Sequence, residues 1–186
     1  MKIKVNYKKI LFILVVYVIY INLFKGYISY YPTIPVYPNN NTDLEIMKKE
    51  MAKRTPEDVK LFFDTNTSIA AAFTPYVKET ENELTRIALS QNYIINFFKY
   101  SINRRRPYQI DKTFKPLSTL TSGTPAYPAG HAYQAMVVAK YLSNKYPEKK
   151  ALFNNIALKC DECRVKAGIH YKSDGEFSRQ LFYLFN

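Results

Sequence analysis

The chain has 186 residues and a formal net charge of +12, from 27 Lys and Arg against 15 Asp and Glu. That length fits one domain plus a terminal segment, and it allows a hydrophobic core without metal or disulfide support. Two Cys and two His exclude a disulfide-rich scaffold and a His-rich metal site. The charge indicates an anionic partner, which is a polyanion, an anionic membrane or a phosphorylated small molecule.

Residues 1–31 are predicted to form an N-terminal membrane signal. Four lysines fall within the first nine residues, and an uncharged apolar stretch follows over residues 10–24. Continued past Lys25, whose side chain can reach the interface, residues 10–31 are long enough to cross a bilayer as a helix. Because no small-residue cleavage site follows, an uncleaved signal anchor is favoured over a cleaved signal peptide. A buried core helix is the third interpretation, and it leaves the lysines unexplained.

The basic flank is expected to stay in the cytoplasm, which places the remainder of the chain outside the cytoplasm or in a lumen. The protein is then membrane-anchored, or secreted if the N-terminal segment is cleaved. Residues 32–42, rich in Pro and Asn, are predicted to be a linker. Residues 43–186 remain for the folded domain.

This domain is predicted to be an all-α bundle with one long connecting loop, because the chain has five Gly and few alternating segments. A capping box at Thr80 and Glu83 starts one helix, which is expected to end before Pro107, and Pro147 is expected to end another. The expected helices cover residues 43–53, a segment starting at 55–58, 80–105, 131–146 and 148–167, with a short helix after 173 and a loop over 107–130.

Lys99 and Arg106 form the first candidate cluster. They are seven residues apart, so on one helix they would lie within about 20° of each other, two turns apart. Both cations could then bind one phosphate, Arg as a planar fork and Lys as a point charge. The alternative is a solvated basic helix end. The neighbouring Arg104 and Arg105 are expected to steer anions inward.

The second cluster is the sequence Pro128-Ala129-Gly130-His131, where the loop becomes a helix. Gly130 lets the backbone approach a ligand closely, and the start of the helix offers unpaired N–H groups to an anion. His131 at this point can protonate a leaving oxygen. The alternative is an ordinary helix start with an incidental histidine.

Arg164, His170 and Asp174 form the third cluster. The histidine and the aspartate are four residues apart, so in a helical segment the carboxylate accepts a hydrogen bond from one ring nitrogen. That bond fixes the tautomer and leaves the other nitrogen as a nucleophile. Arg164 adds a third cation for phosphate, and a surface His–Asp pair is the alternative.

Together the clusters resemble the signature of the type 2 phosphatidic acid phosphatase and vanadium haloperoxidase superfamily. They read Lys99-x6-Arg106-Pro107, Pro128-Ala129-Gly130-His131 and Cys163-Arg164-x5-His170-x3-Asp174. The resemblance covers roughly residues 43–186, looks closest to the soluble bacterial-type acid phosphatases, and implies their helical bundle. Ala129 and Cys163 stand where the motifs have Ser. Losing the first hydroxyl is expected to cost about 1–2 kcal/mol, roughly tenfold in rate or affinity.

The resemblance implies a phosphatase for phosphomonoesters, lipid phosphates among them, that works without a metal or another cofactor. By similarity, His170 attacks phosphorus, Asp174 orients it and His131 protonates the leaving alkoxide. The phosphoryl oxygens are then expected to bind Lys99, Arg106, Arg164, Gly130 and Ala129. The partners implied are a phosphorylated small molecule or lipid phosphate, and a membrane through residues 10–31.

Two other functions remain open. A haloperoxidase would use the same pocket with vanadate as a prosthetic group, whereas vanadate would inhibit a phosphatase; haloperoxidases of the family are generally much larger. A basic, membrane-anchored module that binds anions without catalysis is the other alternative. Nucleic-acid-binding motifs are absent, so no nucleic acid partner is expected. Cys160 and Cys163 are expected to be free, packed thiols, because no partner residues complete a zinc site.

Overall fold

The computed structural model describes residues 7–23 and 36–186, and within these ranges the chain forms helices and turns but no strand. The all-α prediction is therefore confirmed for this part of the chain. The α-helices are α1 (Tyr7–Leu23), α2 (Asn40–Ala52), α3 (Pro56–Asp64), α4 (Glu81–Leu89), α5 (Asn92–Ile102), α6 (Pro107–Ile110), α7 (Gly130–Lys145), α8 (Lys150–Lys166) and α9 (Lys172–Phe185). Short 3₁₀ turns lie at Ile69–Ala72, Thr74–Tyr76 and Pro147–Lys149.

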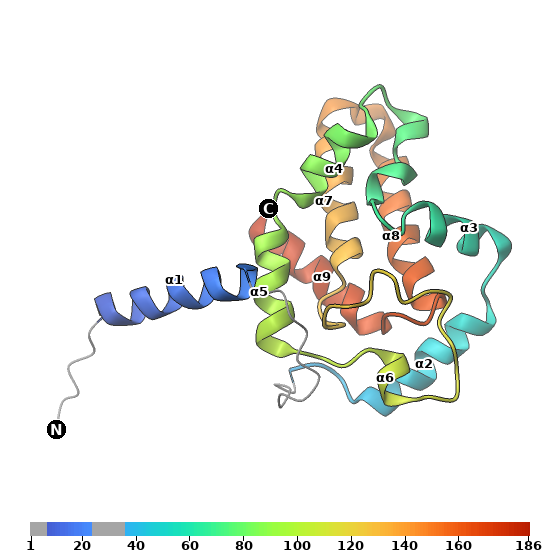
Figure 1. Cartoon of the computed structure of the whole chain (residues 1–186). Helices are drawn as coiled ribbons and strands as arrows, with labels where there is room; N and C mark the ends of the chain where they lie inside the picture. Colours follow the sequence, from blue (N-terminus) through green and yellow to red (C-terminus); the bar gives the residue numbers. More distant parts are fainter. Residues whose placement is uncertain (1–6, 24–35) are drawn as a thin grey trace.

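Helices α7 and α8 form the centre of the bundle. They lie side by side, and α4, α5 and α9 pack around α7 (Figure 1). Half of the residues of α7 are buried, as expected for a helix with neighbours on several sides. The main core gathers around Tyr133, Leu142 and Phe153, all fully buried. This packing fixes the first turn of α7, where the predicted Gly130 and His131 lie.

The helix predicted over residues 80–105 is in fact two helices. The capping box of Thr80 and Glu83 is present, but α4 ends at Leu89 and α5 begins at Asn92. The hydroxyl of Ser90 donates to the Ile87 carbonyl at 2.7 Å, and the Ser90 N–H donates to the same oxygen at 3.2 Å. Serine competes in this way with the backbone ladder of a helix, so the break falls at this residue.

Helix α5 also ends earlier than predicted. Asn103 adopts the left-handed conformation with φ of 56°, which asparagine tolerates better than most residues. Pro107 does not end a helix; it is the first residue of α6, where its missing N–H costs nothing. The predicted loop over 107–130 therefore begins with a helical turn.

Two other boundaries differ from the prediction. Asn39 caps α2 by accepting a hydrogen bond from the N–H of Asn41 at 2.8 Å, so residues 40–42 of the predicted linker are helical. The helix expected to be short after residue 173 has 14 residues, Lys172–Phe185.

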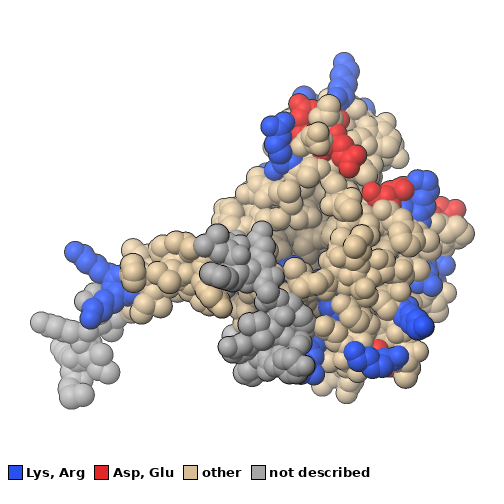
Figure 2. Space-filling model, in the orientation of Figure 1, with Lys and Arg blue, Asp and Glu red and all other residues tan. Residues whose placement is uncertain are grey.

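The N-terminal prediction lies partly outside the described residues, since residues 1–6 and 24–35 are not among them. Helix α1 covers 17 residues, and no helix within the described ranges is long and apolar enough to cross a membrane. It projects from the bundle (Figure 1), with apolar side chains such as Leu11 and Phe12 exposed. Figure 2 shows basic side chains at its outer end, where Lys8 and Lys9 lie in the first turn.

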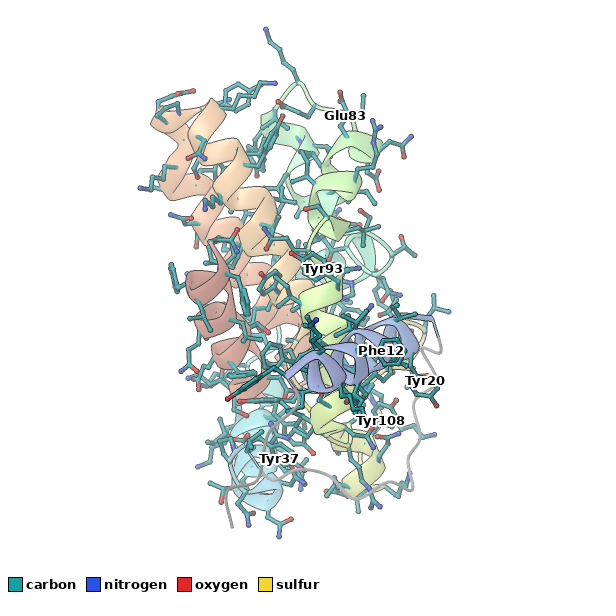
Figure 3. The ribbon with its side chains drawn as sticks, turned by 90° about the vertical axis from the view of Figure 1, so that its left-hand side faces the viewer. Phe12, Tyr20, Tyr37, Glu83, Tyr93 and Tyr108 are labelled. Carbon is teal, nitrogen blue, oxygen red and sulfur yellow. The ribbon has the colours of Figure 1, made fainter. Side chains whose placement is uncertain are left out.

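Helix α1 contacts the bundle through α5. The Tyr17 hydroxyl and the Ser101 hydroxyl are hydrogen-bonded at 2.9 Å, and the Tyr17 ring meets Phe97 edge to face with 6.1 Å between centroids. Figure 3 shows α1 crossing α5 at a level between Tyr93 and Tyr108. The helix that carries Lys99 is thus also the helix that holds α1.

A close contact between α8 and α9 gives a stability prediction. A Cβ at Gly175 of α9 would lie 2.0 Å from Oδ2 of Asp161, whose buried carboxylate is ion-paired with Arg179. Gly→Ala inside a helix normally gains up to about 1 kcal/mol. Here we expect Gly175→Ala to lower the free energy of unfolding by about 2 kcal/mol, because a packed charged group must move.

Thermal unfolding followed by circular dichroism measures this effect, and the Asp161→Ala background is the matched control. Without the carboxylate, Gly175→Ala should become neutral or stabilising. An equal loss of stability in both backgrounds would show that the contact with Asp161 is not the cause.

Candidate active site

One pocket of about 160 Å³ collects residues from distant parts of the chain. It brings together five of the predicted site residues, which are Lys99, Arg106, Gly130, His131 and His170. The other lining residues are Asn92, Ile95 and Asn96 of α5, Thr121 and Thr124 of the loop after α6, and Gln134 of α7. A larger pocket of about 290 Å³ between α2, α8 and α9 contains none of the predicted residues.

His170 and Asp174 form the predicted pair. Nδ1 of His170 donates to Oδ2 of Asp174 at 2.9 Å. Because a guanidinium can only donate, the 2.8 Å contact between NH1 of Arg106 and Nε2 of His170 makes Nε2 an acceptor. Burial lowers the pKa of His170 well below its usual value, and Arg106 and Lys99 lower it further. The ring is therefore neutral, with its proton on Nδ1 and a lone pair on Nε2.

The four-residue spacing suggested that both residues lie in one helix, but only Asp174 does. His170 precedes α9, which begins at Lys172, and Asp174 lies in the first turn of that helix. Oδ2 of Asp174 also accepts from the N–H of Tyr171 at 2.9 Å, and Oδ1 accepts from NH1 of Arg104 at 2.7 Å. Burial raises the pKa of Asp174, and Arg104 opposes that shift. The hydrogen bonds to Oδ1 and Oδ2 together hold the Asp174 carboxylate in one orientation.

Lys99 and Arg106 reach the pocket from different elements, so the prediction that they share one helix is wrong. Lys99 lies on α5, whereas Arg106 follows the turn at Asn103 and caps α6. Lys99 Nζ donates to the carbonyl of Pro125 at 2.5 Å, and Arg106 Nε donates to the carbonyl of Thr124 at 2.9 Å. Burial, with Arg106 nearby, lowers the pKa of Lys99 well below its usual value.

The start of α7 contributes His131 and backbone N–H groups. Nε2 of His131 contacts the carbonyl of Asn66 at 3.2 Å and must donate to it, which leaves Nδ1 as the basic nitrogen. Burial, followed by Arg164 and His170, lowers the pKa of His131 well below its usual value. No side chain caps this helix, so its first N–H groups are available to an anion. A Cβ at Gly130 would lie 3.6 Å from Cε of Lys99.

Arg164 and Ala129 lie beside the pocket without lining it. Arg164 is fully buried; NH1 donates to the carbonyl of Phe62 at 3.2 Å and NH2 to the hydroxyl of Thr65 at 2.9 Å. Its Nε has no partner among the described residues. The Ala129 N–H donates to the Asp174 carbonyl at 3.1 Å, so this residue joins the start of α7 to α9.

The two cysteines are free and buried, as predicted. Cys163 Sγ donates to the carbonyl of Cys160 at 3.3 Å within α8. Within the described ranges, no group of three or more His, Cys, Asp and Glu side chains could hold a metal ion.

Arg104 does not lie where its sequence predicted. It was expected to steer anions from the surface, but its side chain is fully buried and donates through NH2 to Oδ2 of Asp43 at 2.8 Å. Arg104 and Arg106 are buried and Arg105 between them is exposed, as in an extended segment. The sequence has arginine at all three positions, so this alternation is visible only in the structure.

Comparisons with known proteins bear on the fold. No family model matches the chain, and no curated protein matches it. Among solved structures, the chain is similar to the crystal structure of the first transmembrane PAP2 type phosphatidylglycerolphosphate phosphatase from Bacillus subtilis, with a TM-score of 0.52 and 22% identity. The match covers 77% of this chain and 82% of that chain. The likeness is to a transmembrane enzyme, whereas the motifs looked closest to soluble acid phosphatases. The described helical body therefore has the fold of a PAP2 type phosphatase, the superfamily that the three motifs resemble.

Proposed function

We propose that the chain is a phosphatase that hydrolyses phosphomonoesters through a phosphohistidine at His170, without a metal ion. One observation carries the proposal: Nε2 of a neutral, aspartate-oriented histidine lies in a pocket that also holds Lys99 and Arg106. Phosphoryl transfer depends mainly on positioning the reactants and neutralising the oxygen charge. In this pocket His170 is held in position by Asp174, and Lys99 and Arg106 can neutralise the charge on the phosphoryl oxygens.

Substrate binding begins with the cations. A phosphoryl group would replace Nε2 of His170 as the acceptor for NH1 of Arg106, which frees the histidine lone pair. Lys99 and the first N–H groups of α7 would bind the other oxygens. The unpartnered Nε of Arg164 is a further buried donor for a phosphoryl oxygen.

In the first chemical step, Nε2 of His170 forms a bond to phosphorus and the bond to the leaving oxygen breaks. Asp174 stabilises the positive charge that develops on the imidazole ring. A proton passes from Nδ1 of His131 to the leaving alkoxide, so the alcohol departs neutral. Because burial lowers the pKa of His131, the negative phosphate is needed to bring this proton into the site.

In the second step, water attacks the phosphohistidine. Nδ1 of His131, now unprotonated, accepts a proton from the water as the P–N bond breaks. Inorganic phosphate leaves with the proton that the substrate brought into the site, so both histidines return to their neutral starting states. The same nitrogen thus serves as acid and then as base, as microscopic reversibility requires for two steps of one reaction.

Lipid phosphates are included in the proposed substrate class, together with attachment to a membrane through the N-terminal segment and a catalytic domain outside the cytoplasm or in a lumen. Support comes from α1, an apolar helix with exposed side chains that packs on the same helix as Lys99. The structurally similar protein is described as a transmembrane phosphatidylglycerolphosphate phosphatase. Water-soluble phosphomonoesters would use the same phosphoryl site.

Phosphate release by the full-length chain in detergent, with EDTA present, tests the proposal. We expect hydrolysis to persist in EDTA and to be inhibited competitively by micromolar orthovanadate, which adopts the geometry of the transition state. Lys99→Met should weaken vanadate inhibition by about tenfold or more, since one charged donor is lost. The exposed variant Arg86→Gln is the control and should be inhibited like the parent protein.

Loss of activity in EDTA, or indifference to vanadate, would contradict the proposal. Comparing a lipid phosphate in mixed micelles with a soluble aryl phosphate then defines the substrate. Peroxide-dependent halide oxidation, measured with vanadate present, would identify the protein as a haloperoxidase instead.

A further inference from the structure

We infer that Arg104 is a positioning residue for the catalytic pair: it holds Asp174 in the orientation and the ionised state that His170 requires. The kinetic part of this inference rests on the proposed phosphatase function. The structural part concerns the His170–Asp174 pair itself and is testable without turnover.

Every nitrogen of the Arg104 guanidinium has an acceptor. NH1 donates to Oδ1 of Asp174 at 2.7 Å, NH2 to Oδ2 of Asp43 at 2.8 Å, and Nε to Oδ1 of Asn40 at 3.0 Å. The hydroxyl of Ser173 is a further acceptor for NH1, at 2.7 Å. A planar fork with all its donors bound can take only one position.

Two aromatic rings limit the guanidinium further. The centre of the guanidinium lies 3.9 Å from the ring centroid of Tyr171 and 4.5 Å from that of Tyr37. The side chain is fully buried and is not among the residues that line the active-site pocket. Arg104 therefore acts through Asp174, and a substrate in the pocket does not contact it.

Many titratable groups surround the pair, and their positions show what Arg104 adds. These groups are Lys99 of α5, Arg106 before α6, His131 of α7, Asp161 and Arg164 of α8, Asp43 of α2, and the phenols of Tyr127 and Tyr171. Arg104 is the cation bonded directly to the Asp174 carboxylate, in an ion pair that is buried on both sides. Without it, burial favours the protonated form of Asp174.

A protonated Asp174 would lose its hold on the histidine. Its oxygen would become a weaker acceptor for the Nδ1 proton, and the ring could then place its proton on Nε2 instead. Such a tautomer has no lone pair on the nitrogen that must attack phosphorus. Arg104, acting through Asp174, thus works together with Arg106, which donates to Nε2, to keep the lone pair on the nitrogen that attacks phosphorus.

The first test is an NMR titration of the full-length, 15N-histidine-labelled chain. Because the chain has two histidines, one His131 variant suffices to assign both rings. We expect Arg104→Gln to move the protonation of the His170–Asp174 pair to higher pH by about one unit or more, since a cation beside both groups is removed. Arg86→Gln, which removes an exposed arginine charge on α4, should leave this titration unchanged.

The second test is steady-state kinetics with a soluble phosphomonoester. We expect kcat of Arg104→Gln to fall about 10- to 100-fold with KM nearly constant, because a strong bond to Asp174 is lost and no substrate contact changes. Arg104→Lys keeps the charge but loses the fork. Compared with Arg104→Gln, it should lower kcat less and shift the titration less. It also provides the test if the glutamine variant fails to fold.

A folded Arg104 variant whose His170 titrates as in the parent chain would overturn the inference, as would a loss expressed in KM alone. The titration needs no substrate. If the parent chain hydrolyses no phosphomonoester but Arg104→Gln still shifts the titration, the proposed function is refuted and the role of Arg104 stands.

Discussion

Replacing His170 with alanine is expected to lower phosphate release by about 10⁴-fold or more, because the nitrogen that forms the covalent intermediate is removed. The lone pair on Nε2 is fixed by Asp174 on one side of the ring and by Arg106 on the other. Rapid quenching with 32P-labelled substrate should trap an acid-labile phosphohistidine in the parent chain and none in the variant.

The control for this experiment is Asp174→Asn. It keeps the shape of the side chain but alters the hydrogen bond to Nδ1, so activity should fall strongly while some phosphohistidine still forms. Unfolding curves of all variants would show that the bundle is intact. Trapped phosphate on a histidine other than residue 170, or activity that survives His170→Ala, would refute the assigned nucleophile.

The second large effect is expected at His131 and depends on the leaving group. With an alkyl phosphate, whose alkoxide is a poor leaving group, His131→Ala should lower kcat about 10²- to 10⁴-fold, the usual range for a lost general acid. With p-nitrophenyl phosphate the loss should be much smaller, because that phenolate leaves without a proton. Comparing kcat for the two substrates measures the difference.

An equal loss of activity with both substrates would mean that His131 does not protonate the leaving group. Gln134 lies one turn further along α7 and also lines the pocket. Gln134→Ala is therefore the matched variant, and its effect should not depend on the acidity of the leaving alcohol.

The short motifs predicted which residues meet, because each motif is governed by local geometry. The start of α7 at Gly130 follows from the change from loop to helical pattern. The four-residue spacing of His170 and Asp174 predicted their hydrogen bond, although His170 precedes α9 and the pair does not share a helix. The arrangement of Lys99 and Arg106 could not be derived from the seven-residue spacing of their motif. Their convergence depends on the left-handed turn at Asn103, and a periodic helical pattern cannot reveal that turn.

Contacts between distant segments could not be predicted from the chain alone. Asn66 supplies the carbonyl for His131, and Asp43 supplies a carboxylate for Arg104, although neither residue lies in a recognisable motif. The break between α4 and α5 at Ser90 could not be predicted from the chain alone either. Serine is tolerated within helices, and here its hydroxyl ends one while Tyr133 of α7 holds the next residue, Gln91.

The contact of Tyr17 with α5 has a consequence for how this protein tolerates insertions. Tyr17 bonds to Ser101 and packs on Phe97, and these two residues bracket Lys99 in the sequence. The position of α1 relative to the pocket is therefore set by side chains of α5 and not by the length of residues 24–35. Residues added to that stretch should therefore leave the distance from α1 to the phosphate-binding lysine unchanged.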